Sequence, residues 1–334
     1  MTDATIERND FGSFPRSVQA QLAERQTRKA TRHNSALPDD SWGVVDDTVY
    51  RTMEQTLRIV SDLINAGLTS SDPVTAQTSE WDVVDDQGNA TVAMDPETAD
   101  AESSVDFGVQ GVPLPCIYDS FSTGYRENPA PGEAPADAAD IDSLGASVAS
   151  RNVAEKMEKL VFDGWEQTFE GADGQSYDLY GLTNHPKRST GALSDWSTGT
   201  DAVRGDVRAM ISDITDENDF SAGGQGLWLY LGRNRYETLD DIDTAGDGSV
   251  LVRDRVENLS NLGAVREADF LGADEALMFR PTQDVIDLSI PREPTPITWE
   301  GPAGFRDNMM VMGIMAPRVK ATKSGQSGVS HYTA

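Results

Sequence analysis

The sequence contains a single cysteine, Cys116, among its 334 residues. An intramolecular disulfide is therefore impossible, and a cysteine-based metal cage is excluded. The sequence also lacks a run of eighteen apolar residues and an apolar stretch after its first basic residues, so we expect neither a membrane-spanning helix nor a signal peptide. These absences predict a protein that is made and used in a soluble compartment.

Catalytic motifs are also missing. The sequence has no Gly-x-Ser-x-Gly elbow, no His-Glu-x-x-His and no Gly-x-x-x-x-Gly-Lys phosphate loop. Of the three histidines, His33 and His331 fall in terminal segments expected to be mobile. His185 belongs to an Asn-His-Pro turn without a partner or metal motif, which favours a turn residue over a general base. Cys116 has no basic neighbour, so a packed thiol is expected rather than a nucleophile. We expect no enzyme activity and no cofactor.

Lysine is scarce, whereas acidic residues are abundant. The chain has 6 Lys and 21 Arg against 37 Asp and 19 Glu, for a net charge of −29. A compact protein of this mass would expose about 13,000 Å², or one net charge per roughly 450 Å². Such a surface repels itself until molar salt shortens the Debye length to about 3 Å. The composition resembles that of halophilic proteins; a mesophilic acidic protein is the alternative. Regularly spaced apolar residues argue against disorder.

The basic residues are unevenly distributed. Residues 1–32 carry a net charge of +2, residues 308–334 carry +3 with no acid, and no Lys or Arg lies between Arg58 and Arg126. The two terminal segments could form a basic surface, or they could be flexible and solvated, as termini usually are. The candidate residues for a basic surface are Arg25, Arg28, Lys29, Arg32, Lys320 and Lys323.

A long amphipathic helix is the strongest structural signal. Apolar residues recur at three- and four-residue spacing between Ile141 and Val161, with Leu144 and Val148 among them. Acidic residues at its start suit a helix N-terminus, and Gly164 ends it. A helix from about Asp140 to Asp163 would be roughly 35 Å long. The chain then reads Tyr-Gly-Leu-Thr-Asn-His-Pro up to residue 186.

The segments on either side differ in character. Upstream, apolar spacing predicts a helix over 50–66 that Gly67 closes, then an extended segment with a turn at 86–89 and strict alternation at Val105, Phe107 and Val109. Too few apolar residues are present there for an independent core. Downstream, helices are expected over 203–214, from 233 and over 252–262, and strands over 227–231, 265–268, 276–280, 285–289, 297–299 and 309–315. This mixture predicts an α+β fold.

The order of these parts resembles the major capsid proteins of tailed viruses, which have the Hong Kong 97 fold, and the related encapsulin shells. Short phrases in the same order support the resemblance: Phe162-Asp163-Gly164, Gly181-Leu182-Thr183-Asn184, Leu227–Leu231 followed by Arg235-Tyr236, and Asp284–Ile290. It covers roughly residues 50 to 315.

The resemblance implies a domain organisation. It assigns residues 1–49 to an N-terminal arm, 50–74 to the first helix of a peripheral domain, and 75–127 to an extended hairpin loop. Residues 128–181 would hold the rest of that domain with its spine helix, 182–283 an axial domain, 284–316 further peripheral strands, and 317–334 a C-terminal tail.

The same resemblance implies assembly. Copies of the chain would form pentamers and hexamers of an icosahedral virion shell around double-stranded DNA, assembled in the host cytoplasm with portal, scaffold and decoration proteins and without a membrane. The hairpin would contact neighbours through Trp81, Val105, Phe107 and Val109, and the basic surface would face the DNA. Some relatives crosslink a hairpin lysine to an asparagine, but no lysine lies between Lys29 and Lys156 here.

An acidic loop follows the helix expected from residue 233. Asp243, Asp247, Gly248 and Asp254 fall on positions 1, 5, 6 and 12 of a calcium-binding loop, but position 3 is Ala245 and position 12 is an aspartate instead of the usual glutamate. A loop without its own ion is therefore favoured. The resemblance places this loop at the capsomer axis, where copies of Asp240, Asp241, Asp243 and Asp247 would repel one another unless salt or a cation screened them.

Two other functions remain open. An encapsulin-type storage compartment would use the same fold, although the long polar segment before Tyr50 disfavours it. A halophilic soluble α+β enzyme belongs to a different class and would need a pocket with converging polar groups, which no motif indicates.

Overall fold

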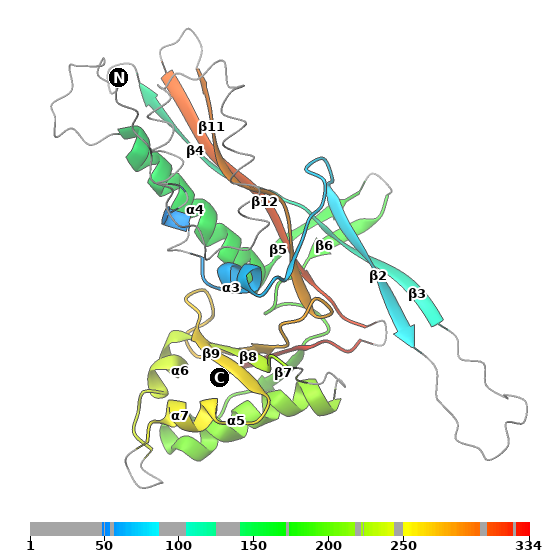
Figure 1. Ribbon diagram of the computed structural model, residues 1–334, viewed down its shortest axis with the longest axis vertical. Helices are drawn as coiled ribbons and strands as arrows, with labels where there is room; N and C mark the ends of the chain where they lie inside the picture. The colour runs from blue at the N-terminus through cyan, green and yellow to red at the C-terminus, as the bar shows by residue number, and fades with distance from the viewer. Residues whose placement is uncertain are drawn as a thin grey trace, which may run out of the picture.

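The computed structural model describes residues 49, 51–53, 57–86, 105–124, 141–171, 174–217, 222, 224–243, 250–300, 306–322 and 325–334. Three parts are visible in Figure 1: an elongated body around the long helix α4 (Ile141–Asp163), a lobe with α5 to α7, and a projecting β-hairpin. The architecture is α+β, as the sequence predicts.

The body packs α4 and the short helix α3 (Ile59–Asn65) against a four-stranded sheet. The sheet has the order β1-β11-β12-β4, with antiparallel pairs except for parallel β1 and β11. Its strands are β1 (Thr69–Ser70), β4 (Cys116–Gly124), β11 (Ile286–Glu300) and β12 (Arg306–Val319). The spine helix expected over 140–163 is therefore present, with nearly the same bounds.

The buried face of α4 differs from the expected one only in the N-terminal half of the helix. Met157, Leu160 and Val161 are buried, as the apolar spacing predicts. Ala146, Ala149 and Val153 are also buried, whereas Leu144 and Val148 are 55% and 51% exposed. A Cβ on Gly145 would lie 2.3 Å from the Phe121 ring of β4, so small residues let the helix approach the sheet closely. Leu144 and Val148 lie outside this contact. A prediction from the spacing of large apolar residues misses the contact because the residues that make it are small.

The turn after α4 closes the helix with specific hydrogen bonds. Gly164 has a φ of 66°, a conformation that favours glycine, and a Cβ there would lie 2.2 Å from the carbonyl oxygen of Leu179. Leu182 and Thr183 donate their amides to the carbonyls of Val161 and Phe162, both at 2.9 Å. The Gly-Leu-Thr-Asn phrase therefore satisfies the open carbonyls at the C-terminus of α4.

The lobe contains a five-stranded sheet that is buried on both faces. Its order is β7-β13-β10-β8-β9. On β8, Trp228 and Tyr230 pack into the core shared with the body, whereas Leu227, Leu229 and Leu231 pack under the helices of the lobe. The continuous apolar run that predicts this strand follows from burial on both sides.

The bounds of the lobe elements are as follows. The strands are β7 (Ser189–Ala192), β8 (Leu227–Leu231), β9 (Leu262–Glu267), β10 (Ala276–Phe279) and β13 (Val329–Thr333). The helices are the 3-10 turn η2 (Trp196–Thr198), α5 (Thr200–Ser212), the π-helical turn η3 (Asp213–Glu217), α6 (Arg233–Thr238) and α7 (Val252–Glu257).

The C-terminal segment corrects the expectation of a free tail over 317–334. Residues 317–319 still belong to β12, and β13 pairs with β10 on one edge and with β7 on the other. His331, expected to be mobile, is buried in β13 and lies 3.2 Å from a carboxylate oxygen of Glu275. Strand pairing between segments this far apart in the chain leaves no local signal in the sequence.

The projecting hairpin joins β2 (Thr78–Asp86) and β3 (Val105–Pro113) in antiparallel register from Thr78–Pro113 to Asp86–Val105. Of the turn expected at 86–89, only Asp86 is described, as the last residue of β2, and residues 87–89 lie outside the described residues. A second hairpin, β5 (Trp165–Glu170) and β6 (Ser176–Leu179), contacts β3, and the Tyr177 hydroxyl donates to Glu80 at 2.9 Å.

The first predicted helix, over 50–66, is shorter than expected. Residues 51–53 are helical, but Leu57 and Arg58 are not, and α3 begins at Ile59. A φ of 74° at Gly67 ends this segment, as predicted.

Candidate assembly interfaces

A buried polar network fixes the root of the β2–β3 hairpin to the body. Arg318 of β12 binds both carboxylate oxygens of Asp287 on β11 at 2.5 Å, and it donates to the Ser79 hydroxyl of β2 at 3.1 Å. Asp72 accepts hydrogen bonds from the hydroxyls of Ser79 at 2.7 Å and Ser289 at 2.5 Å. Because the buried charges are paired and hydrogen-bonded, the hairpin root is held in a fixed orientation.

The four predicted hairpin contacts have different environments. Trp81 is partly buried against the body, with the Arg318 guanidinium 5.7 Å from its ring centre, so it belongs to the root. Val109 is 66% exposed on β3. Val105 and Phe107 also lie on β3, but their side chains are outside the description. Among the described side chains of this set, Val109 alone is available to a neighbour.

Only one residue of the predicted basic surface is described. Lys320 donates to Asp287 at 3.0 Å and to the carbonyl of Gln283 at 2.6 Å, so it takes part in the hairpin-root network. The other five members, Arg25, Arg28, Lys29, Arg32 and Lys323, lie outside the described residues.

The acidic tip of the lobe is partly neutralised from within. Asp240 pairs with Arg253 at 2.9 Å, and Asp243 pairs with Arg255 at 3.3 Å. Asp243 is buried and accepts a hydrogen bond from the Thr200 hydroxyl at 2.8 Å, so its carboxylate faces the lobe interior. Asp241 is exposed. The arginines on α7, which the sequence analysis overlooked, are the counter-charges of this tip.

The calcium-loop candidates gain no support from this arrangement. Asp243 is already paired, Asp254 is exposed on α7, and Asp247 lies outside the description. Among the described residues, no group of three or more His, Cys, Asp or Glu side chains could hold a metal ion.

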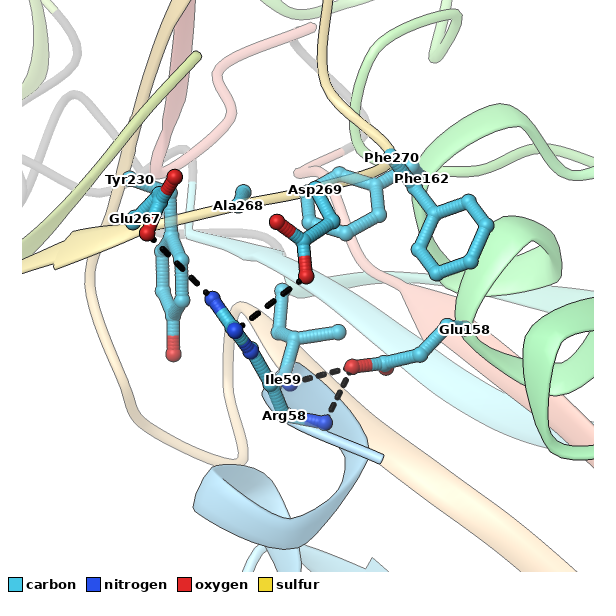
Figure 2. Close-up of a pocket in the computed structure, with 9 residues that line it drawn as sticks. All are labelled: Arg58, Ile59, Glu158, Phe162, Tyr230, Glu267, Ala268, Asp269 and Phe270. Carbon is cyan, nitrogen blue, oxygen red and sulfur yellow. Dashed lines mark hydrogen bonds and ion pairs between the residues drawn. The ribbon is translucent and has the colours of Figure 1, made fainter. Parts of the chain in front are cut away.

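A buried carboxylate on α4 caps α3. Figure 2 shows Glu158 directed at the start of α3, where it accepts hydrogen bonds from the amides of Arg58, Ile59 (2.7 Å) and Val60 (3.1 Å). Burial raises the pKa of Glu158 to about 7. The charge of Asp62 adds to this rise, whereas the hydrogen bonds from the three amides oppose it. The sequence-based expectations did not include Glu158. Its position was the available signal, because it lies four residues after Ala154 and three before Val161, which are both buried.

Charged side chains continue this junction into the lobe. Arg58 pairs with Glu267 at 3.6 Å and Asp269 at 3.3 Å (Figure 2). Nearby, Asp62 of α3 pairs with Arg266 of β9 at 2.8 Å and accepts a hydrogen bond from Tyr230 at 2.7 Å. Burial and Asp62 raise the pKa of Tyr230, which keeps its hydroxyl a donor. These contacts and the shared hydrophobic core join the body to the lobe.

Three features bear on a catalytic site in the described part of the chain: the junction pocket, His185 and Cys116. The junction pocket in Figure 2 has a volume of about 10 Å³, at the lower limit for one water molecule. His185 is buried in the turn after α4, where burial lowers its pKa to about 4, which fits a structural role. Cys116 is exposed on β4 rather than packed, contrary to the sequence-based expectation. No described helix is long and apolar enough to cross a membrane.

Solved structures of shells share this architecture. The chain is similar to a virus-like particle from Pyrococcus furiosus (14% identity, 87% of this chain and 99% of that chain covered, TM-score 0.56). It is also similar to the capsid of Myoviridae phage XM1 (11%, 82% and 92%, TM-score 0.57) and to the capsid of a native GTA particle (15%, 83% and 91%, TM-score 0.54). The fold is therefore that of Hong Kong 97-type capsid proteins.

The family assignment is separate from this likeness of fold. The chain belongs to a family described as a family of unknown function (DUF6260), whose model matches residues 30–332. No curated protein matches the chain.

Proposed function

We propose that the chain is the major capsid protein of a halophilic tailed virus and that it assembles into pentamers and hexamers of an icosahedral shell around double-stranded DNA. The observation that carries the proposal is the fold, which is shared with viral capsids over more than four-fifths of the chain. The net charge of −29 supports a halophilic, archaeal origin, because such a surface needs molar salt to be screened.

Three features suit the chain to this role. The β2–β3 hairpin projects beyond the body, and its root is fixed by the Arg318–Asp287 pair, so it can reach a neighbouring copy without losing its direction. The junction at Glu158 and Arg58 holds the lobe against the spine. The lobe would form the rings, with the exposed Asp241 at the axis.

The proposed partners follow from this role. Copies of the chain itself are the main partner, while portal, scaffold and decoration proteins would act during assembly in the host cytoplasm. The basic N-terminal residues would face the packaged DNA. They lie outside the described residues, so their support is the charge distribution of the sequence.

A second candidate is an encapsulin-type compartment. The specific observation in its favour is the virus-like particle from Pyrococcus furiosus, 99% of which is covered by the match. The two candidates share the same subunit contacts and differ in what the shell contains.

Electron microscopy of the purified chain in molar potassium chloride tests the proposal. Closed shells or rings of five and six are expected, and nuclease-protected DNA in native particles would distinguish a capsid from a compartment that holds protein. A chain that stays monomeric at high concentration, with and without added scaffold or portal, would refute the shell function.

A hairpin variant sharpens this test. Val109→Asp should block assembly without changing the free energy of unfolding of the free chain, because a charge would be buried only in the shell. Val148→Asp adds the same charge at an exposed position on α4 and serves as the matched control. Equal assembly of both variants would argue against a hairpin contact at Val109.

A further inference from the structure

A groove rich in arginine lies on the helical side of the lobe, between α5 and α7. It has a volume of about 560 Å³ and is lined by Arg204, Arg208, Ile211, Arg255, Asn258, Leu259 and Ser260. Figure 1 shows the two helices beside each other at the outer side of the lobe. Three arginines in one groove are unusual in a chain with 56 acidic and 27 basic residues.

The helical spacing of the two helices creates the groove. Arg204 and Arg208 are four residues apart on α5, so they share a face, and Ile211 follows three residues later. On α7, Arg255 is four residues before Leu259, which lies just beyond the helix end. The groove therefore combines guanidinium groups with two apolar side chains.

The positive charge of the groove is only weakly compensated. Arg208 is exposed and has no ion pair among the described residues. Arg204 contacts the exposed Asp201 at 3.9 Å, and its buried Nε has no hydrogen-bond partner there. Arg255 is 42% exposed and pairs through Nε with Asp243. Donors of this kind match carboxylates in a bidentate geometry.

We propose that this groove binds an acidic segment of a second copy of the chain, next to it in the capsomer. The inference rests on the proposed shell function and adds to it the surface by which neighbouring lobes recognise each other. Charge complementarity selects the occupant: a second copy carries a net charge of −29, so a groove lined by three arginines is where it can approach with least repulsion. Ile211 is buried in the lobe core, so the partly buried Leu259 is the apolar side chain that a bound peptide could contact.

The test compares assembly of two charge-matched double variants. Arg204→Gln with Arg208→Gln removes two of the three groove arginines, whereas Arg151→Gln with Arg233→Gln removes the same charge from exposed positions on α4 and α6. Sedimentation and electron microscopy give the protein concentration at which half of the chain is assembled. We expect the groove variant to need about tenfold more protein than the control at moderate salt. Equal assembly of the two variants would overturn the inference.

Cross-linking identifies the occupant. Arg208→Lys provides an amine that a carbodiimide can join to a carboxylate in direct contact. In nuclease-treated shells assembled from a mixture of light and ¹⁵N-labelled chains, linked pairs of one light and one heavy peptide at position 208 are expected. Links confined to one chain, such as a link to Asp201, would overturn the inference. The inference would also be overturned if Arg204→Gln with Arg208→Gln lost DNA binding without losing assembly.

The two levels of the proposal fail differently. If the unmodified chain forms shells and the groove variant assembles as its control does, the groove inference alone is wrong. If the unmodified chain never assembles, the shell function is wrong, and the groove inference falls with it.

Discussion

Replacing Glu158 with glutamine is expected to remove a pH dependence of stability between about pH 4.5 and 7. In the folded protein, burial raises the pKa of this carboxyl from 4.5 to about 7. Within that window the folded chain keeps a proton at Glu158 that the unfolded chain has lost. The contribution of Glu158 to the free energy of unfolding therefore falls as the pH rises, and it is constant below 4.5 and above 7.

The expected size follows from the shift. The pKa rises from 4.5 to about 7, and a tenfold change in proton affinity corresponds to about 1.4 kcal/mol, so the contribution changes by about 3.5 kcal/mol across the window. Glutamine cannot ionise, and it keeps one carbonyl oxygen for the amides of Arg58 and Ile59, which share one carboxylate oxygen in the unmodified chain. Its amide nitrogen replaces the second oxygen, which accepts from Val60, so the variant should be about 1–3 kcal/mol less stable than the unmodified chain near pH 4.5. Between pH 4.5 and 7 the difference should move in favour of the variant by about 3.5 kcal/mol.

Urea unfolding at a fixed high salt concentration, followed by far-ultraviolet circular dichroism, measures this effect. The relevant quantity is the difference in free energy of unfolding between the unmodified chain and the variant at each pH, because the other acidic groups cancel in the difference. Glu158→Ala is the control for the cap itself, since it should lower stability by about 1–2 kcal/mol at the low end of the range.

A difference that is flat with pH would refute the reasoning. A difference of opposite sign, with the unmodified chain gaining on the variant as the pH rises, would mean that the three amide hydrogen bonds stabilise the ionised carboxylate by more than burial costs it.

Four further variants test other parts of the structure. Asp287→Ala leaves Arg318 buried beside a second cation and should lower the free energy of unfolding by about 3–5 kcal/mol in urea; a loss below about 1 kcal/mol would mean that the pair is not buried in solution. Gly164→Ala should destabilise the chain by more than about 2 kcal/mol, because Gly164 has a positive φ and a carbonyl lies close to where the added Cβ would be. Gly205→Ala, with open space around it, should stabilise α5 by about 0.5–1 kcal/mol. Equal effects of the two substitutions in thermal unfolding would contradict this reasoning. Asp241→Asn should lower the salt concentration needed for assembly, measured by sedimentation, whereas an unchanged requirement would place this residue away from a symmetry axis.

The spine helix and strand β8 could be predicted because their signals are local. The apolar spacing of residues 141–161 and the uninterrupted run Leu227–Leu231 each fix one element without reference to the rest of the chain. The order of such elements was enough to predict the fold class.

The interfaces were harder to predict because they depend on pairing between distant segments. Lys320 was assigned to a basic surface from its position near the C-terminus, but its partner Asp287 lies on the neighbouring strand. The groove arginines Arg204 and Arg255 come from two helices that only the folded lobe brings together. Charge that is counted along the sequence cannot show which cations are already paired.

The position of β13 has a consequence for how the chain acquires its structure. This strand lies between β7 and β10, yet β11 and β12 of the body come before it in the sequence. The lobe sheet therefore cannot be completed while the body strands are still being synthesised, and closing it requires a long loop. Residues 182–283 expressed as a separate fragment would lack β13 and expose the edges of β7 and β10 to aggregation. Until that strand docks, a newly made chain has no finished lobe, so the lobe sheet is completed only after synthesis has passed residue 333.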